Sequence, residues 1–330
     1  CFASCEQYMN RVKSRTYQQI RSTHRKDYQA LFERSRFQLE TEGREEIPLN
    51  QRLKRIKRGE TDLGLYCLYY HFNRYLLISS SRPGSQPANL QGIWSESTRP
   101  VWSSNWTINI NTEMNYWAAQ PLGLDVCEQP LIDTFDDLAQ SGSITAAYQY
   151  GITNDRGDDQ YKPGDPWGMH HNYDLWRGTQ PIDNATAGLW PTGGVWLLDH
   201  AWQYYNFNKD TEYLAEVYPY LVGAAKFFTQ FLVVDPKTGY LITAASCSPE
   251  QGGVQPGPAM DTQLVRNLYD MVQKASEILG KTSENAELLA KINEQMPSSY
   301  LADEKGKIAP NIIDDAGLIL SLIHISEPTR

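Results

Sequence analysis

Apolar residues recur at helical spacing through most of the chain. In the clearest segment, 213–233, Leu214, Val217, Leu221 and Phe228 would share one helix face. The same spacing predicts further helices at 6–38, as one or two elements, and at about 62–78, 113–120, 130–149, 188–206, 261–279 and 284–296. Strand patterns are few, so the chain is predicted to be mainly α.

Polar loops separate these predicted helices, and the longest are 86–107, 151–187 and 236–260. Long ordered loops carry function more often than packing. Helices that alternate with such loops predict helical hairpins arranged around a central cleft. A fixed-period repeat, which would indicate a solenoid, is not found in the sequence.

The stretch 105–117 holds four asparagines, two tryptophans and one glutamate. Asn109 and Asn111 alternate with Ile108 and Ile110, which predicts an extended segment with the amides on one face and the isoleucines on the other. An amide both donates and accepts hydrogen bonds, so such a row suits sugar hydroxyls or a bound water. A turn whose amides only satisfy the local backbone is an equally open interpretation.

Composition and charge narrow the class of protein. The 330 residues are 41% hydrophobic and 21% charged, which is typical of a globular protein, and no apolar run is long enough to cross a bilayer. Residues 1–60 carry 14 Lys and Arg against 8 Asp and Glu, whereas the whole chain has a net charge of −9. Aromatic residues at helical spacing in this basic arm favour a helix docked on protein over nucleic-acid binding.

The sequence predicts no metal and no cofactor. The five cysteines have no CxxC spacing, so they indicate neither a zinc site nor a disulfide framework. His170 and His171 are adjacent, and adjacent side chains point in different directions on any regular element. Nucleophile-elbow, phosphate-loop and dinucleotide motifs are also not found in the sequence.

All nine tryptophans lie between Trp94 and Trp202. Such a local concentration of flat, amphipathic rings suggests a groove that stacks on sugar rings, although a Trp-rich core is the alternative. Polar and aromatic side chains in the same third of the chain are predicted to bind the hydroxyls and rings of a sugar. These candidates are His170, His171, Asp174, Trp176 and Trp190.

The loop 243–253 places one carboxylate, Glu250, among small residues, directly after Pro249. A partly buried Glu in such surroundings would have a raised pKa and could act as a general acid. A solvated loop Glu is the alternative interpretation. Together these patterns predict a carbohydrate-active protein in which Glu250 is the candidate acid and Asn109 and Asn111 form the polar grip.

Several motifs, in order along the chain, closely resemble glycoside hydrolase family 95, the inverting α-L-fucosidases. They are residues 87–94, 109–117, 170–176, 188–191 and 248–250, and the resemblance runs from about residue 10 to about residue 310. It implies an (α/α)6 barrel that removes terminal α-L-fucose, with an α-1,2 linkage as the expected one. It also implies that Glu250 is the general acid and that Asn109 and Asn111 hold the attacking water.

The resemblance also predicts how the chain is organised. Residues 1–45 are expected to form a helical linker arm, residues 46–320 an incomplete barrel, and residues 321–330 a tail that looks non-native. The family's N-terminal β-sandwich and last barrel helices, with the Asp that serves as general base, are expected to be missing. The implied partner is an oligosaccharide or polysaccharide rather than a membrane, and the implied location is periplasmic or secreted, although the chain shows no export signal.

Thr107 bears on specificity. Family members commonly carry His two residues before the first of the paired amides, where this chain has Thr107. L-Galactose is L-fucose with an added hydroxyl at C6, and a shorter polar side chain leaves room for that hydroxyl and can bond it. An α-L-galactosidase therefore remains an alternative, as do a non-catalytic sugar-binding module and a purely structural helical protein.

The chain as written is expected to show little or no hydrolysis, because an inverting glycosidase needs a base as well as an acid. Release of nitrophenol from nitrophenyl α-L-fucoside measures this. Turnover close to that of a full-length relative would refute the expectation.

Overall fold

The computed structural model describes residues 2–295, apart from residues 42, 159 and 238. It divides into two compact units. The first comprises Cys1–Pro87 and Ala118–Gln129, and the second comprises Ala88–Trp117 and everything described from Pro130 onward. The predicted boundary between residues 45 and 46 therefore falls inside the first unit and stays a prediction, and the predicted tail 321–330 lies outside the described residues.

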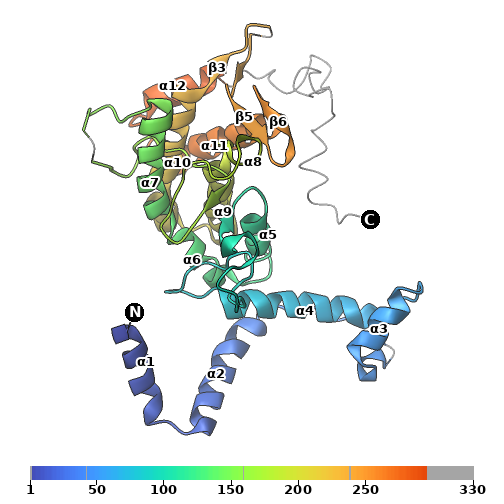
Figure 1. The fold of residues 1–330 in the computed structure, drawn as a ribbon. Helices are drawn as coiled ribbons and strands as arrows, with labels where there is room; N and C mark the ends of the chain where they lie inside the picture. The colour runs from blue at the N-terminus through green and yellow to red at the C-terminus, as the bar shows by residue number, and fades with distance from the viewer. Residues whose placement is uncertain (1, 42, 159, 238, 296–330) are drawn as a thin grey trace. The chain divides into compact units, whose positions relative to one another are not determined.

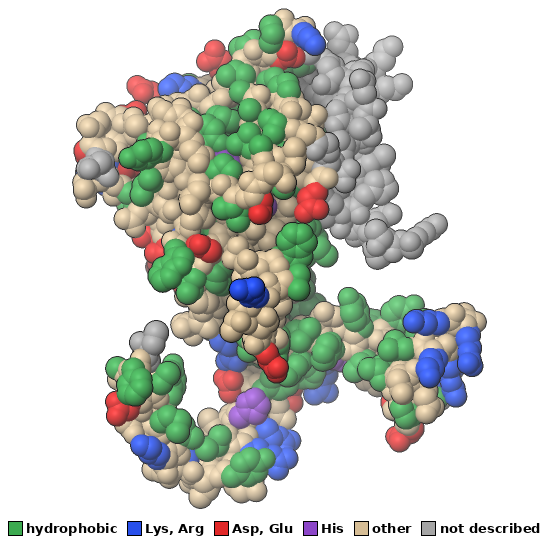
Figure 2. All heavy atoms as spheres, viewed as in Figure 1, with side chains coloured by type: hydrophobic (Ala, Val, Ile, Leu, Met, Phe, Trp, Pro, Cys, Tyr) green, Lys and Arg blue, Asp and Glu red, His purple; other side chains and the backbone are tan. Residues whose placement is uncertain are grey.

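The first unit is helical. Its helices are α1 (Phe2–Lys13), α2 (Tyr17–Phe32), α3 (Leu49–Ile56) and α4 (Leu63–Ser80), with short 3-10 turns at Arg44–Glu46 and Asp125–Cys127. The predicted helical region 6–38 is thus two helices, and α2 begins at a capping box formed by Thr16 and Gln19. Figure 2 shows Lys and Arg side chains gathered over α3. The sequence analysis did not predict this helix.

A buried ion pair joins α3 to α4. Arg52 Nε donates to Asp62 Oδ2 and Arg52 Nη2 donates to Asp62 Oδ1, each at 2.8 Å. Asp62 also caps α4, because its Oδ1 accepts from the Leu65 amide at 3.3 Å. A Cβ at Gly64 would lie 2.6 Å from Arg52 Nη2, so the close approach of the guanidinium requires glycine there.

The second unit holds the larger core. Its helices are α5 (Asn111–Tyr116), α6 (Gln129–Ile132), α7 (Phe135–Tyr150), α8 (Ala185–Gly188), α9 (Gly193–Asn208), α10 (Thr211–Phe231), α11 (Ala259–Ile278) and α12 (Ala286–Gln295). Helix α10 is central, because it packs on α7, α9, α11 and α12 (Figure 1). The pattern at 213–233 predicted this helix, and Asp210 caps its first turn.

Some predicted boundaries were wrong. The helix predicted at 113–120 runs over Asn111–Tyr116, and the one predicted at 130–149 is divided between α6 and α7. The helix predicted at 188–206 begins only at Gly193, after the separate short turn α8. The helices predicted at 62–78, 261–279 and 284–296 correspond to α4, α11 and α12, although residue 296 lies outside the described residues.

Three antiparallel pairs of short strands complete the fold. They are β1 (Trp106–Thr107) with β2 (Asn172–Tyr173), β3 (Val233–Val234) with β4 (Leu241–Ile242), and β5 (Ser246–Ser248) with β6 (Gln251–Gln255). The described part of the chain is therefore mainly α, as predicted. No described helix has the length and apolar character to cross a membrane.

Trp167 anchors the long loop 151–187 in the core between α7, α9 and α10. A Cβ at Gly142, Gly194 or Gly223 would lie 2.9, 2.6 or 2.8 Å from its ring, so each helix contributes a glycine at the contact. The indole Nε1 donates to the Tyr220 carbonyl at 2.9 Å. Shape, rather than ring stacking, therefore sets the position of this loop.

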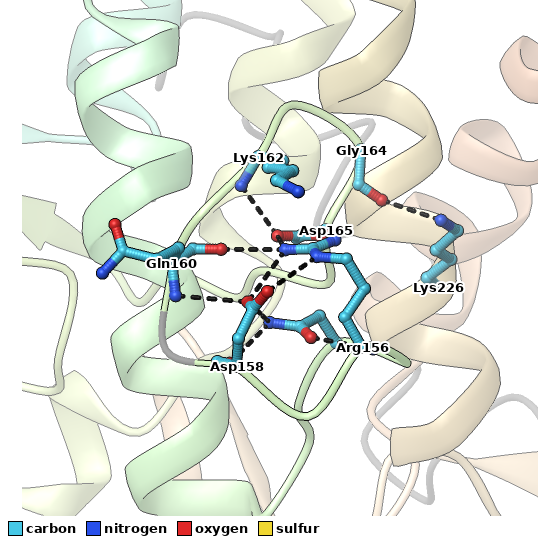
Figure 3. A network of polar contacts seen from close by, with 8 residues as sticks. Arg156, Asp158, Gln160, Lys162, Gly164, Asp165 and Lys226 are labelled. Atoms are coloured by element: carbon cyan, nitrogen blue, oxygen red, sulfur yellow. Dashed lines mark hydrogen bonds and ion pairs between the residues drawn. The ribbon is translucent and has the colours of Figure 1, made fainter.

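Polar contacts hold the outer part of the same loop (Figure 3). The guanidinium of Arg156 donates to both carboxylate oxygens of the buried Asp165, at 2.7 and 2.8 Å, and also pairs with Asp158. Lys226 of α10 donates to the Gly164 carbonyl at 3.0 Å. The loop is therefore ordered by its own charges and fastened to α10.

Helix α5 buries a carboxyl group. Glu113 is fully buried, and neither of its oxygens has a hydrogen-bond partner among the described residues. Burial raises the pKa of Glu113 to about 8, although the nearby His200 lowers it. The carboxyl group is therefore mostly neutral at pH 7, and the folded protein binds one proton more than the unfolded chain there.

Glu113→Gln is expected to change how stability depends on pH. Because the folded-state pKa is raised, the contribution of Glu113 is fully present below its ordinary pKa of 4.5 and is lost as pH rises through about 8. The free energy of unfolding of the wild type, relative to the variant, should therefore fall across this window by about 1.4 kcal/mol per pH unit. Urea unfolding at several pH values measures it. The matched control is Glu216→Gln, at an exposed position on α10. If the difference in the free energy of unfolding between the wild type and Glu113→Gln did not change with pH, the prediction would be contradicted.

Candidate functional site

Backbone pairing brings two of the predicted motifs together. Trp106 pairs with Tyr173 and Thr107 pairs with Asn172, and the Ile108 amide donates to the His171 carbonyl at 2.8 Å. The Thr107 hydroxyl donates to Asn172 Oδ1 at 3.2 Å. Residues 65 apart in sequence are thus neighbours, and Asn109 follows directly after this pairing.

The predicted alternation of amides and isoleucines is wrong. The strand ends at Thr107, and Asn111 is the first residue of α5 rather than part of an extended segment. Asn109 is buried with 6% of its surface exposed, whereas Asn111 is exposed. A helix turns by about 100° per residue, so its start removes the two-residue period on which the prediction relied.

His170 is a buried structural histidine. Its Nδ1 lies 3.0 Å from the Thr179 carbonyl and its Nε2 lies 2.7 Å from the Tyr150 hydroxyl. A carbonyl can only accept, so Nδ1 carries the proton and Nε2 accepts from Tyr150. Burial lowers the pKa of His170 to about 4, which keeps the ring neutral. With no exposed surface, His170 does not contact a sugar, which corrects that prediction.

His171 lies between acidic groups. Its side chain is buried, and its Nε2 is 3.8 Å from Asp183 Oδ2. Burial lowers the pKa of His171, while the charges of Asp183 and Glu250 and the carbonyl of Gly188 raise it. This histidine is therefore within electrostatic reach of the predicted acid.

Glu250 lies at the turn of the β5–β6 hairpin, where Ser248 pairs with Gln251. Its side chain is exposed, which agrees with the interpretation of Glu250 as a solvated loop residue and not with partial burial. The hairpin itself is well anchored, because the Cys247 amide donates to the Leu189 carbonyl at 2.8 Å. A fixed hairpin thus presents an accessible carboxylate.

His171 connects the two halves of the predicted site. Its backbone carbonyl holds the segment that leads into Asn109, and its side chain interacts electrostatically with Glu250. That Glu250, Asn109 and Asn111 face one shared hollow stays a prediction.

A tight turn displays Trp176. Asp174 Oδ1 accepts from the Trp176 and Gly178 amides at 2.9 and 3.2 Å, so this carboxylate holds the turn. Arg177 has a left-handed φ of 61°, and its guanidinium lies 5.8 Å from the Trp106 ring. Trp176 is left 84% exposed, which suits stacking on a sugar ring.

The tryptophans divide between core and surface. Trp94, Trp102, Trp117 and Trp176 are exposed, whereas Trp106, Trp167, Trp190, Trp196 and Trp202 are buried. Trp190 has no exposed surface, so the prediction that it binds substrate directly is wrong for this structure. Both interpretations of the tryptophan cluster thus hold in part.

The sequence analysis missed the two carboxyl groups that have no exposed surface among the described residues, Glu113 and Asp261. Asp261 accepts hydrogen bonds from Trp190, Thr192 and Thr243. Glu113 lies in the motif 109–117 and Asp261 is the first residue of the predicted helix 261–279. Neither was singled out, because no periodic pattern in a sequence marks a buried carboxyl group. Among the described residues, no cluster of His, Cys, Asp and Glu could hold a metal ion.

Comparisons with known proteins place these features in a family. A family model described as the glycosyl hydrolase family 95 catalytic domain matches residues 16–313. The chain is 35% identical over 295 residues to "Alpha-L-fucosidase 2" of Arabidopsis thaliana, which covers 85% of this chain and 34% of that protein. It is 32% identical over 267 residues to "Probable alpha-fucosidase A" of Aspergillus niger, which covers 78% of this chain and 32% of that protein.

Among solved structures, one described as "Putative kojibiose phosphorylase from human microbiome" matches 76% of this chain and 36% of its own, with a TM-score of 0.50 and 10% identity. At this identity the likeness shows the fold alone. It agrees with the predicted part of an (α/α)6 barrel. The chain spans about a third of the length of the two fucosidase-named relatives it matches.

Trp190→Ala and Trp176→Ala are expected to differ sharply in their effect on stability. Trp190 is fully buried, so its truncation should lower the free energy of unfolding by about 3–5 kcal/mol. Trp176 is 84% exposed, and its truncation should change that free energy by less than about 0.5 kcal/mol. Urea unfolding of both variants measures the two values, and equal losses would contradict this assignment of core and surface.

Proposed function

The chain belongs to glycosyl hydrolase family 95, and from this premise we propose that it carries the acid side of an inverting glycosidase site for terminal α-L-fucose. The observation that carries the proposal is the hydrogen bond from the Ile108 amide to the His171 carbonyl, which fixes the backbone directly before Asn109 to the histidine segment. The charge of Glu250 also contributes to raising the pKa of His171. The names of the relatives support fucose as the sugar. Because the chain spans about a third of their length, the activity proposed is that of the complete polypeptide.

In the proposed reaction, Glu250 donates its proton to the glycosidic oxygen as the bond from that oxygen to the anomeric carbon breaks. A water held by Asn109 and Asn111 attacks the anomeric carbon from the opposite face, so the configuration inverts. The amides can orient this water, but they cannot take its proton. A carboxylate base must accept that proton, and we assign it to the family's Asp, which the sequence analysis did not find in this chain.

The exposure of Glu250 leaves its carboxyl group accessible to the leaving oxygen of a bound substrate, which a general acid must reach. An inverting enzyme places its acid and base about 6.5–9.5 Å apart, with room for the water between them. Trp176 is the ring that we propose to stack on the sugar or its aglycone.

Thr107 supports L-galactose as a second candidate substrate. Its hydroxyl proton is donated to Asn172, so its oxygen keeps lone pairs that can accept from a C6 hydroxyl. Such a hydrogen bond would favour the binding of L-galactose over that of L-fucose, which has only a methyl group at that position. An enzyme directed at external polysaccharides would act in the periplasm or outside the cell, and we propose that location.

Glu250→Gln in the complete polypeptide is expected to lower kcat for an unactivated fucoside by about 10²–10⁴-fold, because the amide cannot protonate the leaving group. The substitution Glu216→Gln on α10 should leave kcat unchanged. Proton NMR of the first product formed should detect the β-anomer. Release of the α-anomer would refute inversion, and a wild-type protein that binds L-fucose without hydrolysing any fucoside would instead identify a sugar-binding module.

The ratio of kcat/KM for the nitrophenyl α-L-fucoside and the α-L-galactoside decides between the two sugars. Thr107→Val keeps the shape of the side chain but removes the hydroxyl. If L-galactose is the substrate, this variant should lose activity on the galactoside selectively, by about 10-fold or more. Equal losses on both substrates would contradict a role for Thr107 in reading C6.

A further inference from the structure

Asp261 forms a buried junction below the hairpin that carries Glu250. It lies in the first turn of α11 and has no exposed surface. Its Oδ1 accepts from Trp190 Nε1 at 2.9 Å and from the Thr192 hydroxyl at 3.1 Å, while its Oδ2 accepts from the Thr243 hydroxyl at 2.9 Å. The Ser246 hydroxyl, at the start of β5, donates to the Cys247 carbonyl at 3.3 Å.

These donors come from the segment 190–192 and from the loop that precedes the hairpin of Glu250. Thr243 lies in that loop, three residues before β5 begins at Ser246. Trp190 follows Leu189, whose carbonyl accepts from the Cys247 amide in the middle of β5. One carboxylate therefore bonds to the loop before β5 and to the segment on which β5 rests.

A fully buried carboxylate is costly unless several donors compensate it. An apolar side chain of similar size would fill the same space without that cost, so packing alone does not account for Asp261. The indole Nε1–H of Trp190 can only donate a hydrogen bond. A group at the position of Asp261 Oδ1 must therefore be an acceptor, because a donor there would point its own hydrogen at the indole hydrogen. The arrangement thus specifies the relative placement of three segments more tightly than apolar contact would.

We propose that Asp261 is a positioning residue for Glu250, which it acts on by locking β5 to the segment 189–192 and to the start of α11. This inference rests on the proposed role of Glu250 as general acid. Asp261 itself is buried and touches no substrate.

Protonation of Asp261 offers a direct readout of this coupling. Burial raises the pKa of Asp261 to about 6, against the hydrogen bonds from its donors, so the carboxyl titrates near neutral pH. Burial raises the pKa values of Tyr150 and Cys247, and the charge of Asp261 raises both further. The histidines nearby are His170, whose pKa is about 4 and which bonds to Tyr150, and His171, whose own titration must be separated by a control.

The first experiment follows the ¹⁵N-labelled chain by NMR from about pH 4.5 to about pH 8. We expect the Trp190 indole resonance, assigned with Trp190→Phe, and the backbone amides of Ser246 and Cys247 to shift along one titration curve. Asp261→Asn should abolish that common shift at both places. Asp270→Asn, on the same helix but solvent-exposed, should leave it intact.

The inference is overturned if the β5 amides do not titrate in the wild type, or if they still follow the same curve in Asp261→Asn. In the latter case His171 is the titrating group. Should Asp261→Asn fail to fold, Thr243→Val removes one donor and keeps the carboxylate. It should then uncouple the β5 amides while the Trp190 resonance still titrates, and an unchanged β5 response would refute the coupling.

The second experiment measures kcat of the complete polypeptide. Misplacement of a catalytic group by about 1 Å can cost up to about 100-fold, so Asp261→Asn and Thr243→Val should each lower kcat by at least about 10-fold with KM changed by less than about 3-fold. Asp270→Asn should match the wild type. An inactive wild type would refute the proposed function and leave the NMR result standing, whereas an active wild type with fully active variants would refute the positioning role alone.

Discussion

The short antiparallel pairing of Trp106–Thr107 with Asn172–Tyr173 is the contact on which the candidate site depends. It is extended by the bond from the Ile108 amide to the His171 carbonyl and covered by the stacked rings of Trp106 and Tyr173, whose centroids are 5.1 Å apart. The Arg177 guanidinium lies over both rings and pairs with Asp137 of α7. Without this pairing, the amide segment and the histidine segment would have no fixed relation.

Buried ionisable groups surround the site, and each is accommodated differently. Glu113 has no hydrogen-bond partner among the described residues, so burial keeps it mostly protonated. His170 is held neutral by a carbonyl and a tyrosine hydroxyl. Asp261 is surrounded by donors, which lower its pKa but only partly offset burial. Each of these interior groups is thus settled by burial or by hydrogen bonds, whereas the proposed general acid, Glu250, is exposed.

The distribution of the tryptophans shows why composition alone was ambiguous. A tryptophan buries a large ring whether it lies in a core or under a sugar, so a cluster of rings in sequence is compatible with both. The structure places Trp190 against Asp261 in the core and leaves Trp176 on a turn held by Asp174. The deciding factors are the hydrogen bond of the indole and the backbone of the turn, and both depend on partners distant in the sequence.

Local pattern was sufficient for the main helices, because an apolar face repeats every three or four residues wherever a helix packs on a core. The face at Leu214, Val217 and Leu221 predicted α10 to within two residues at either end. Helix α3 was missed, since its apolar residues Leu49, Leu53 and Ile56 are exposed and its length is only eight residues. The motifs likewise sufficed for the family, because their order along the chain is specific.

Tertiary structure alone decided which of the candidate side chains are accessible. The alternation at Asn109 and Asn111 failed because α5 begins there, and helix starts depend on what the first turn packs against. The burial of His170 and Trp190 and the exposure of Glu250 follow from contacts with residues such as Tyr150 and Asp261, up to 71 positions away. Sequence patterns record the local period of a segment, whereas burial is set by the distant segments that cover it.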